Sequence, residues 1–343
     1  MPAPLHRRRV AAALACVVAG AAMGAARCEP RPGDRVVLVS TRPVGCATDP
    51  ARLSAGVYGA EFRVEGDSTR WVEAPVEPTL SSLDPSLPIV VYIHGNLIDA
   101  PDARRRGRDV YRRLVRCAGD DRTVQFVIFS WCSGKVRGVL RDYREKAART
   151  RPVAAQFAWT LDRLPAGSRV GVLGYSYGAR VASGAAHLAA GGSMNGLRYG
   201  FLDTPPELRG VFLAGAYDAC WNAAGRYHGR ALDALDTLLV TKNARDPALR
   251  FYKWVPREAD PPAIGDVGPR GLDASRASRV AVRDVTSSVG KSHDLYEYLG
   301  APGLLRSAWT RLTFADRSPE PTLAEGSGEA EPLGGDPSLA VVR

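Results

Sequence analysis

Short apolar runs alternate along this chain with segments of helical periodicity. The runs lie at 87–96, 123–131, 168–176, 208–218, 236–246 and 278–285. The run 87–96 is a continuous stretch of β-branched and other apolar residues, which is typical of a strand buried on both faces. Strands that alternate with helices favour a mostly parallel sheet with helices on both faces. We therefore predict an α/β fold with its chemistry at the carboxyl ends of the strands.

Composition divides the 343 residues into four parts. Residues 1–26 have a basic cluster, then an apolar Ala/Val run, then small residues, which is the layout of a signal peptide. Residues 27–86 contain two leading strands, at 34–45 and 58–66, and residues 87–314 form the core of the domain. Residues 315–343 are rich in Pro, Gly, Ser and Glu, which predicts a disordered tail. Within the core, the helical stretch 137–164 contains Pro152 and is expected to break there.

The signal peptide predicts export, to the periplasm or out of the cell. Membrane attachment is expected only if an N-terminal anchor is retained or a lipid is attached at Cys28, and Arg27 stands where a lipidation signal has a small residue. Removal of Cys16 leaves an odd number of cysteines, of which one pair fits a disulfide in an oxidising compartment. No cysteine or histidine spacing matches a metal site, so no metal is predicted.

The net charge of +10 does not indicate a nucleic-acid partner. Arginines are scattered among acidic residues, and the segment 102–116 has the pattern of a solvated helix face. We therefore expect no nucleic acid among the partners.

Gly174-Tyr175-Ser176-Tyr177-Gly178 fits the pattern G-x-S-x-G between a predicted strand and a predicted helix. At such a corner the backbones come close, so glycines flank a serine whose hydroxyl is pushed out above the sheet. This context predicts that Ser176 is a nucleophile.

The run 87–96 ends in His94-Gly95-Asn96. Acyl transfer builds negative charge on a carbonyl oxygen, which two backbone N–H groups usually hold. The amides of Asn96 and Tyr177 are the candidates. His94 is interpreted as structural, because a histidine at a strand end more often braces its loop.

A serine nucleophile needs a base, and the chain has five histidines. His6 lies in the signal peptide, His94 in the oxyanion loop, His187 well along a helix, and His228 before the last strands, which leaves His293. Its partner acid is predicted to be Asp246, because that choice preserves the order Ser, Asp, His along the chain. Asp218, which ends an earlier strand, remains the alternative acid.

These residues resemble those of the α/β-hydrolase superfamily, and specifically of a bacterial family of uncharacterised α/β-hydrolase-like proteins. The similar elements run from about residue 87 to about residue 300: Ile93-His94-Gly95, Phe129-Ser130-Trp131-Cys132-Ser133-Gly134, the serine turn 174–178, and Asn243-Ala244-Arg245-Asp246-Pro247-Ala248-Leu249. The resemblance implies an α/β-hydrolase fold and supports Asp246 as the acid. Cys132 replaces the usual proline of that family, and Tyr177 the common methionine.

The sequence thus predicts a serine hydrolase, carboxylesterase-like, that forms an acyl-enzyme with a small-molecule ester and uses no cofactor. A non-catalytic binding or cell-envelope interaction protein on the same scaffold is the first alternative, and a serine peptidase is the second. The acyl chain length and the oligomeric state stay open.

Overall fold

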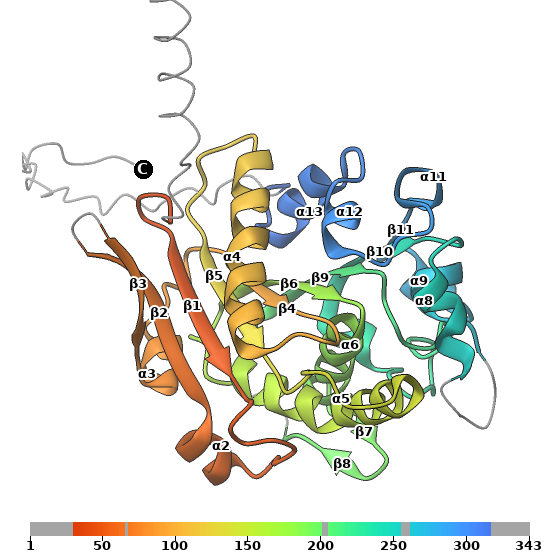
Figure 1. Cartoon of the computed structure of the whole chain (residues 1–343), viewed down its shortest axis with the longest axis horizontal. Helices are drawn as coiled ribbons and strands as arrows, with labels where there is room; N and C mark the ends of the chain where they lie inside the picture. The colour runs from red at the N-terminus through yellow and green to blue at the C-terminus, as the bar shows by residue number, and fades with distance from the viewer. Residues whose placement is uncertain (1–29, 66–67, 201–204, 255–260, 317–343) are drawn as a thin grey trace, which may run out of the picture.

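A computed structural model describes residues 30–65, 68–200, 205–254 and 261–316 of the chain. The predicted signal peptide lies outside these residues, as does the predicted tail from residue 317 onward. The described residues form a nine-stranded sheet in the order β11-β10-β9-β6-β4-β5-β1-β2-β3 (Figure 1). Its strands are β1 (Arg35–Ser40), β2 (Tyr58–Glu65), β3 (Ser68–Glu73), β4 (Ile89–Ile93), β5 (Gln125–Ser130), β6 (Arg169–Tyr175), β9 (Glu207–Leu213), β10 (Leu235–Lys242) and β11 (Val280–Asp284).

The sheet is mostly parallel, as predicted. All neighbouring pairs from β11 through to β1 are parallel, and only β2 and β3 pair antiparallel at one edge. Each apolar run of the core supplies one strand, while β3 was not predicted. A separate two-stranded ribbon joins β7 (Ser193–Met194) to β8 (Leu197–Arg198).

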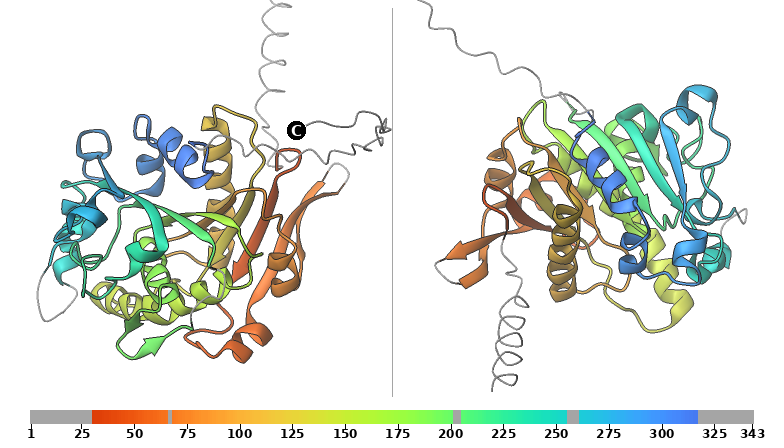
Figure 2. Two further views of the ribbon diagram at one scale, coloured as in Figure 1. Left: turned by 180° about the vertical axis from the view of Figure 1, so that it is seen from behind. Right: turned by 90° about the horizontal axis from the view of Figure 1, so that it is seen from above.

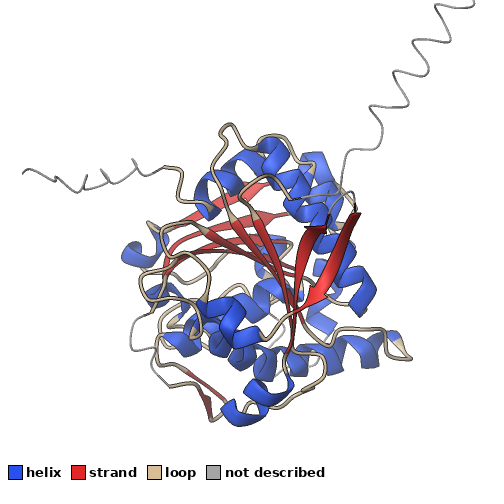
Figure 3. Ribbon diagram, turned by 90° about the vertical axis from the view of Figure 1, so that its left-hand side faces the viewer, coloured by secondary structure: helices blue, strands red, loops and turns tan. Residues whose placement is uncertain are grey.

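Helices cover both faces of the sheet (Figures 2 and 3). On one face α4 (Ala100–Cys117) contacts β5, and α13 (Leu304–Leu312) contacts β6 and β9. On the other, α6 (Tyr177–Ala189) contacts β4, β6 and β9, and α5 (Val139–Leu161) packs on α6. The remaining helices are α2 (Pro50–Gly56), α3 (Val76–Ser81), α7 (Ala231–Ala234), α8 (Pro247–Arg250), η1 (Phe251–Trp254), α9 (Ile264–Val267), α10 (Ala274–Ala277), α11 (Thr286–Val289) and α12 (Leu295–Leu299).

The expected break at Pro152 is wrong. Helix α5 runs without interruption from Val139 to Leu161 with Pro152 inside it. A proline removes one backbone hydrogen bond and crowds the preceding turn, a loss of about 3 kcal/mol or more. Residues 153–161 are all buried, so the packing of this half of the helix offsets the loss.

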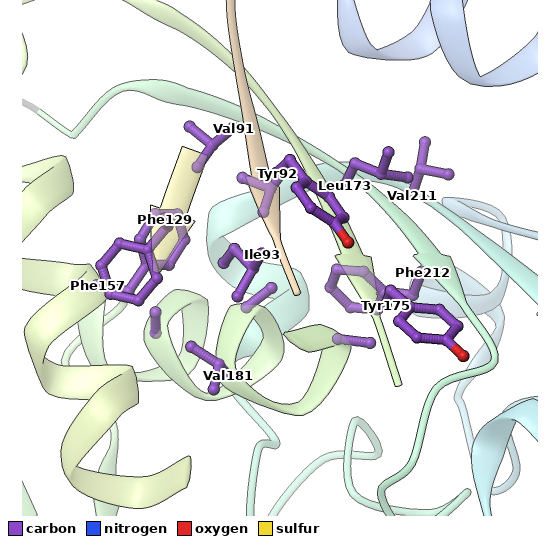
Figure 4. Packing of buried hydrophobic residues seen from close by; sticks show 14 of the residues in the cluster. Val91, Tyr92, Ile93, Phe129, Phe157, Leu173, Tyr175, Val181, Val211 and Phe212 are labelled. Atoms are coloured by element: carbon purple, nitrogen blue, oxygen red, sulfur yellow. The ribbon is translucent and has the colours of Figure 1, made fainter. Parts of the chain in front are cut away.

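The core lies on both faces of the sheet, between the strands and α4 and α13 on one side and α6, backed by α5, on the other. Figure 4 shows Tyr92 and Ile93 of β4 beside Leu173 and Tyr175 of β6, all of them buried. Because β4, β6, β9 and β10 are parallel, their carboxyl ends share one edge of the sheet, and the loops that follow them meet there.

The described residues also bear on two other expectations. Cys46, Cys117, Cys132 and Cys220 are all free thiols, so the suggested disulfide does not form among them. Within the described ranges, no helix combines the length and the apolar character needed to cross a bilayer.

Candidate active site

Ser176 sits at the sharp turn from β6 into α6. Its backbone φ of 53° lies in the left-handed region, which residues other than glycine rarely adopt. The glycines on either side are required by crowding: a Cβ on Gly174 would lie 2.6 Å from the Ala179 Cα, and one on Gly178 would lie 2.0 Å from the Ile93 carbonyl oxygen. The turn therefore holds the serine in a strained backbone conformation at the edge of the sheet.

Ser176, His293 and Asp246 form a continuous hydrogen-bonded chain. His293 Nε2 lies 3.0 Å from Ser176 Oγ, and His293 Nδ1 lies 2.6 Å from Asp246 Oδ2. Since an ionised carboxylate only accepts, Nδ1 carries the proton and Nε2 is left to accept from the serine hydroxyl. Asp246 follows β10, and His293 lies between α11 and α12. The arrangement can remove the serine proton as the hydroxyl attacks a carbonyl carbon.

The Asp246 carboxylate is fully buried and held by three further donors. Its Oδ1 accepts from the Ala248 and Leu249 amides at 2.9 and 3.3 Å, so Asp246 also caps α8. Its Oδ2 accepts from the Tyr298 hydroxyl at 2.7 Å. Burial, and then the adjacent carboxylate, raise the pKa of Tyr298, which keeps this hydroxyl protonated as a donor. Sequence reasoning missed Tyr298, since no motif surrounds it.

Tyr175 fixes the loop that carries the histidine. Its hydroxyl donates to the backbone carbonyl of His293, and burial raises the pKa of Tyr175 well above its usual value. The residue before Ser176 thus also positions His293. The G-x-S-x-G pattern accepts any residue there, so it gave no sign of this role.

Asp218, the alternative acid, lies elsewhere. Its Oδ1 accepts from the Tyr252 hydroxyl at 2.8 Å, and its backbone pairs with Ala263. The carboxylate that bonds His293 Nδ1 is that of Asp246. The structure therefore brings Asp246, rather than Asp218, to the histidine.

The loop after β4 lies against the serine turn. A Cβ on Gly95 would lie 3.1 Å from the Ser176 Cβ, so the backbone here passes close to the serine. Asn96 follows directly, and Tyr177 is the first residue of α6. Asn96 is thus the neighbour in sequence of Gly95, which lies against Ser176, and Tyr177 is the neighbour in sequence of Ser176 itself. Both predicted oxyanion amides therefore belong to residues close to Ser176.

His94 is buried and contacts backbone groups and the side chains of Arg42 and Ser133 rather than Ser176. Its Nδ1 donates to the Gly95 carbonyl at 2.9 Å, and its Nε2 accepts from the Trp131 amide at 3.2 Å. Burial, and then the Arg42 guanidinium, lower the pKa of His94 to about 3, so the ring is neutral. These contacts are those of a brace for the loop. His187 and His228 are buried, and burial lowers the pKa of each.

A cavity of about 280 Å³ opens beside the serine. Its lining residues are mostly apolar: Val139, Leu140, Tyr143, Ser176, Tyr177, Ala216, Ala248, Leu249, Phe251, Tyr252 and His293. At the rim, Val139, Leu140 and Phe251 are 73%, 51% and 57% exposed, which is unusual for large apolar side chains. The apolar wall of the cavity comes from the start of α5 and from α8 and η1. Sequence reasoning missed it because no motif lies in these segments.

Nothing in the described ranges gathers three or more His, Cys, Asp or Glu side chains in a group able to hold a metal ion.

The chain matches no protein-family profile and no curated protein. Solved structures give weak likenesses. Esterase B from Lactobacillus rhamnosis is 13% identical in two structures, one of them inhibited, with TM-scores of 0.41 and 0.39 and coverage of 89% of this chain and 96% of that one. A bacterial heroin esterase is 12% identical, with a TM-score of 0.35 and coverage of 89% and 91%.

The resemblance to one bacterial family stays a prediction. The fold assignment rests on the chain itself. A mostly parallel sheet has helices on both faces, and a strained serine turn leaves the end of a central strand, with the acid and the histidine following later in the chain. The protein has the α/β-hydrolase fold.

Proposed function

We propose that this protein is a serine hydrolase that cleaves carboxylic esters with an uncharged, apolar acyl group. The observation that carries the proposal is the chain from Ser176 through His293 to the buried Asp246, opening into an apolar cavity.

In the proposed reaction, Ser176 Oγ attacks the carbonyl carbon while His293 Nε2 takes the hydroxyl proton. The amides of Asn96 and Tyr177 stabilise the oxyanion of the tetrahedral intermediate. As the intermediate collapses, the ester C–O bond breaks and His293 returns the proton to the leaving alkoxide. Water, deprotonated by His293, then attacks the acyl-enzyme and releases the acid and Ser176. Asp246 orients the ring and stabilises the imidazolium throughout.

The cavity supports the apolar acyl group. No Asp, Glu, Lys or Arg side chain lines it. A charged acyl group would lose its hydration there without gaining a partner, which is unfavourable, whereas an alkyl chain gains by leaving water. A serine nucleophile fits acyl transfer, and an open apolar cavity favours small esters over peptides.

The test is labelling of the intact protein with a fluorophosphonate, followed by mapping of the modified residue, together with hydrolysis of nitrophenyl esters. We expect the label on Ser176, and we expect Ser176→Ala to remove both labelling and turnover while unfolding near the wild-type temperature. Ser183→Ala is the matched control, because Ser183 is a buried serine of α6, the helix that follows Ser176, and it bonds Asn222 and His228 rather than lining the cavity. It should keep the label even if its stability falls. A wild-type protein that neither takes the label nor cleaves any ester would instead favour the non-catalytic binding protein.

A further inference from the structure

The buried carboxylate of Asp142 joins the proposed oxyanion loop to two other segments. Asp142, in the first turn of α5, accepts from the Asn96 side-chain amide at 2.5 Å through Oδ2. Through Oδ1 it accepts from the Val136 backbone amide at 2.6 Å and from Lys146 Nζ at 3.2 Å. The loop after β4, the loop after β5 and helix α5 therefore meet at a single side chain.

Stability alone explains this cluster poorly. The Lys146 side chain is 0% exposed and that of Asp142 is 4% exposed, so the ion pair is removed from water. Desolvation of two charges usually offsets their attraction, and apolar residues of similar volume often serve the fold as well or better. What the carboxylate does that an apolar residue cannot is accept hydrogen bonds from the Asn96 side chain and from the Val136 backbone amide, and so hold the two loops together.

The rest of the loop is tied down on either side of Asn96. The Arg42 guanidinium donates to the carbonyls of Ile98 and Asp99 at 2.9 and 3.1 Å, and His94 holds Gly95. Asn96 itself is held through its Nδ2 by Asp142, and its buried Oδ1 has no partner among the described residues. The next residue, Leu97, has a φ of 59°, a conformation that an untethered leucine rarely adopts.

We propose that Asp142 is a positioning residue. By holding the Asn96 side chain, it fixes the Asn96 backbone amide where the oxyanion forms, while Lys146 supplies the opposing charge. The proposal rests on the proposed function. Val139, Leu140 and Tyr143 of the same first turns line the cavity. The Asp142 carboxylate thus also sets the acyl wall relative to the oxyanion loop.

Two variants separate this role from a general effect on folding. Asn96→Ala removes the tether and keeps the backbone amide. Asp142→Leu with Lys146→Met removes the ion pair and replaces it with apolar groups of similar size, so no unpaired charge stays buried. For each we expect kcat to fall about 10- to 100-fold with KM within about twofold, because a displaced donor weakens binding of the transition state more than of the ester. All three changes together should cost no more than the larger of the two, since both break one interaction.

Gln156→Ala is the control. Gln156 is a buried side chain of the same helix, and its amide ties the carbonyls of Gly45 and Ala47 far along the chain from the oxyanion loop. We expect this variant to lose stability and keep kcat. Folded Asn96 and Asp142 variants with kcat within twofold of wild type, or losses that add in the combined variant, would overturn the proposal.

Amide hydrogen exchange keeps the two proposals distinguishable. We expect residues 95–98 to exchange faster in both variants and unchanged in Gln156→Ala, whatever the substrate. Unchanged exchange at 95–98 would overturn the tether. The exchange experiment could support the tether while the protein takes no fluorophosphonate and cleaves no ester. That result would contradict the proposed function, and with it the catalytic role of the tether, but not the tether itself.

Discussion

Among single residues, the proposed acid Asp246 is where one substitution is most informative. Replacement of aspartate by asparagine keeps size and removes charge, so the histidine loses the partner that stabilises its imidazolium. Asp246→Asn should lower kcat by several powers of ten, about the 10⁴-fold known for the equivalent change in a serine protease. Asp218→Asn should keep most of the activity, because Asp218 contacts Tyr252 rather than His293. Steady-state kinetics on both purified variants checks this, and an inactive Asp218→Asn beside an active Asp246→Asn would move the acid one strand back.

His94 predicts a pH dependence of stability. Its pKa is about 3 in the folded protein, lowered by burial and by Arg42, against an ordinary value of 6.5. Between these values the unfolded chain binds a proton that the folded chain does not, so stability falls as the pH drops from about 6.5 toward 3, by at most about 1.4 kcal/mol per pH unit for this group. Above about pH 7 the group contributes no slope.

Urea unfolding from pH 7 to pH 4 measures that slope. His187 and His228 add slopes of the same sign, because burial lowers the pKa of each. We therefore expect His94→Gln to be less stable than the wild type at pH 7 but to show a shallower decline below pH 6.5. An unchanged slope in His94→Gln would show that this ring does not titrate differently in the folded and unfolded states.

At the scale of elements, the wall built by α5, α8 and η1 predicts a preference for chain length. Each buried CH₂ contributes up to about 0.8 kcal/mol, or about a fourfold gain in kcat/KM. We expect kcat/KM for nitrophenyl esters to rise from acetyl to hexanoyl. Ala216 lines the cavity, and its amide donates to the Ser176 carbonyl at 3.2 Å, so Ala216→Leu should place a larger side chain beside the serine. This variant should lose the hexanoyl preference and keep acetyl turnover, and equal losses on both esters would place the acyl chain elsewhere.

The sequence predicted those elements whose cause is local in the chain and missed those that depend on tertiary contacts. The parallel strands were predictable because continuous apolar runs need burial on both faces, and the serine turn because close backbones exclude a Cβ at Gly174 and Gly178. Pro152 misled, because the burial of 153–161 is a tertiary effect that outweighs a local propensity. The roles of Tyr298 and Asp142 depend on side chains that meet only after folding, 52 and 46 residues from their partners Asp246 and Asn96. No pattern along the chain marks such pairs.

Over the whole molecule, the described fold limits where an export signal can be removed. The N-terminal strand β1 lies inside the sheet between β5 and β2, so its loss would split the sheet. The segment just before it is also tied in: the Arg31 amide is bonded to the Tyr111 hydroxyl at 2.9 Å, and Asp34 accepts from the Val124 amide at 2.8 Å. A cut beyond about residue 30 would therefore remove contacts of the folded domain.

We predict export with cleavage ahead of these contacts. The basic cluster Arg7-Arg8-Arg9, the Ala/Val run and the small residues up to Ala26 have the order that a signal peptidase recognises. Mature protein from the native host should begin between residues 25 and 30, which keeps Arg31 and β1 whole. N-terminal sequencing of the extracytoplasmic fraction measures this directly, with a cytoplasmic enzyme followed as a marker of leakage. Protein found in the cytoplasm with residue 1 or 2 at its terminus would contradict export, and a terminus beyond Asp34 would contradict the place of β1 in the sheet.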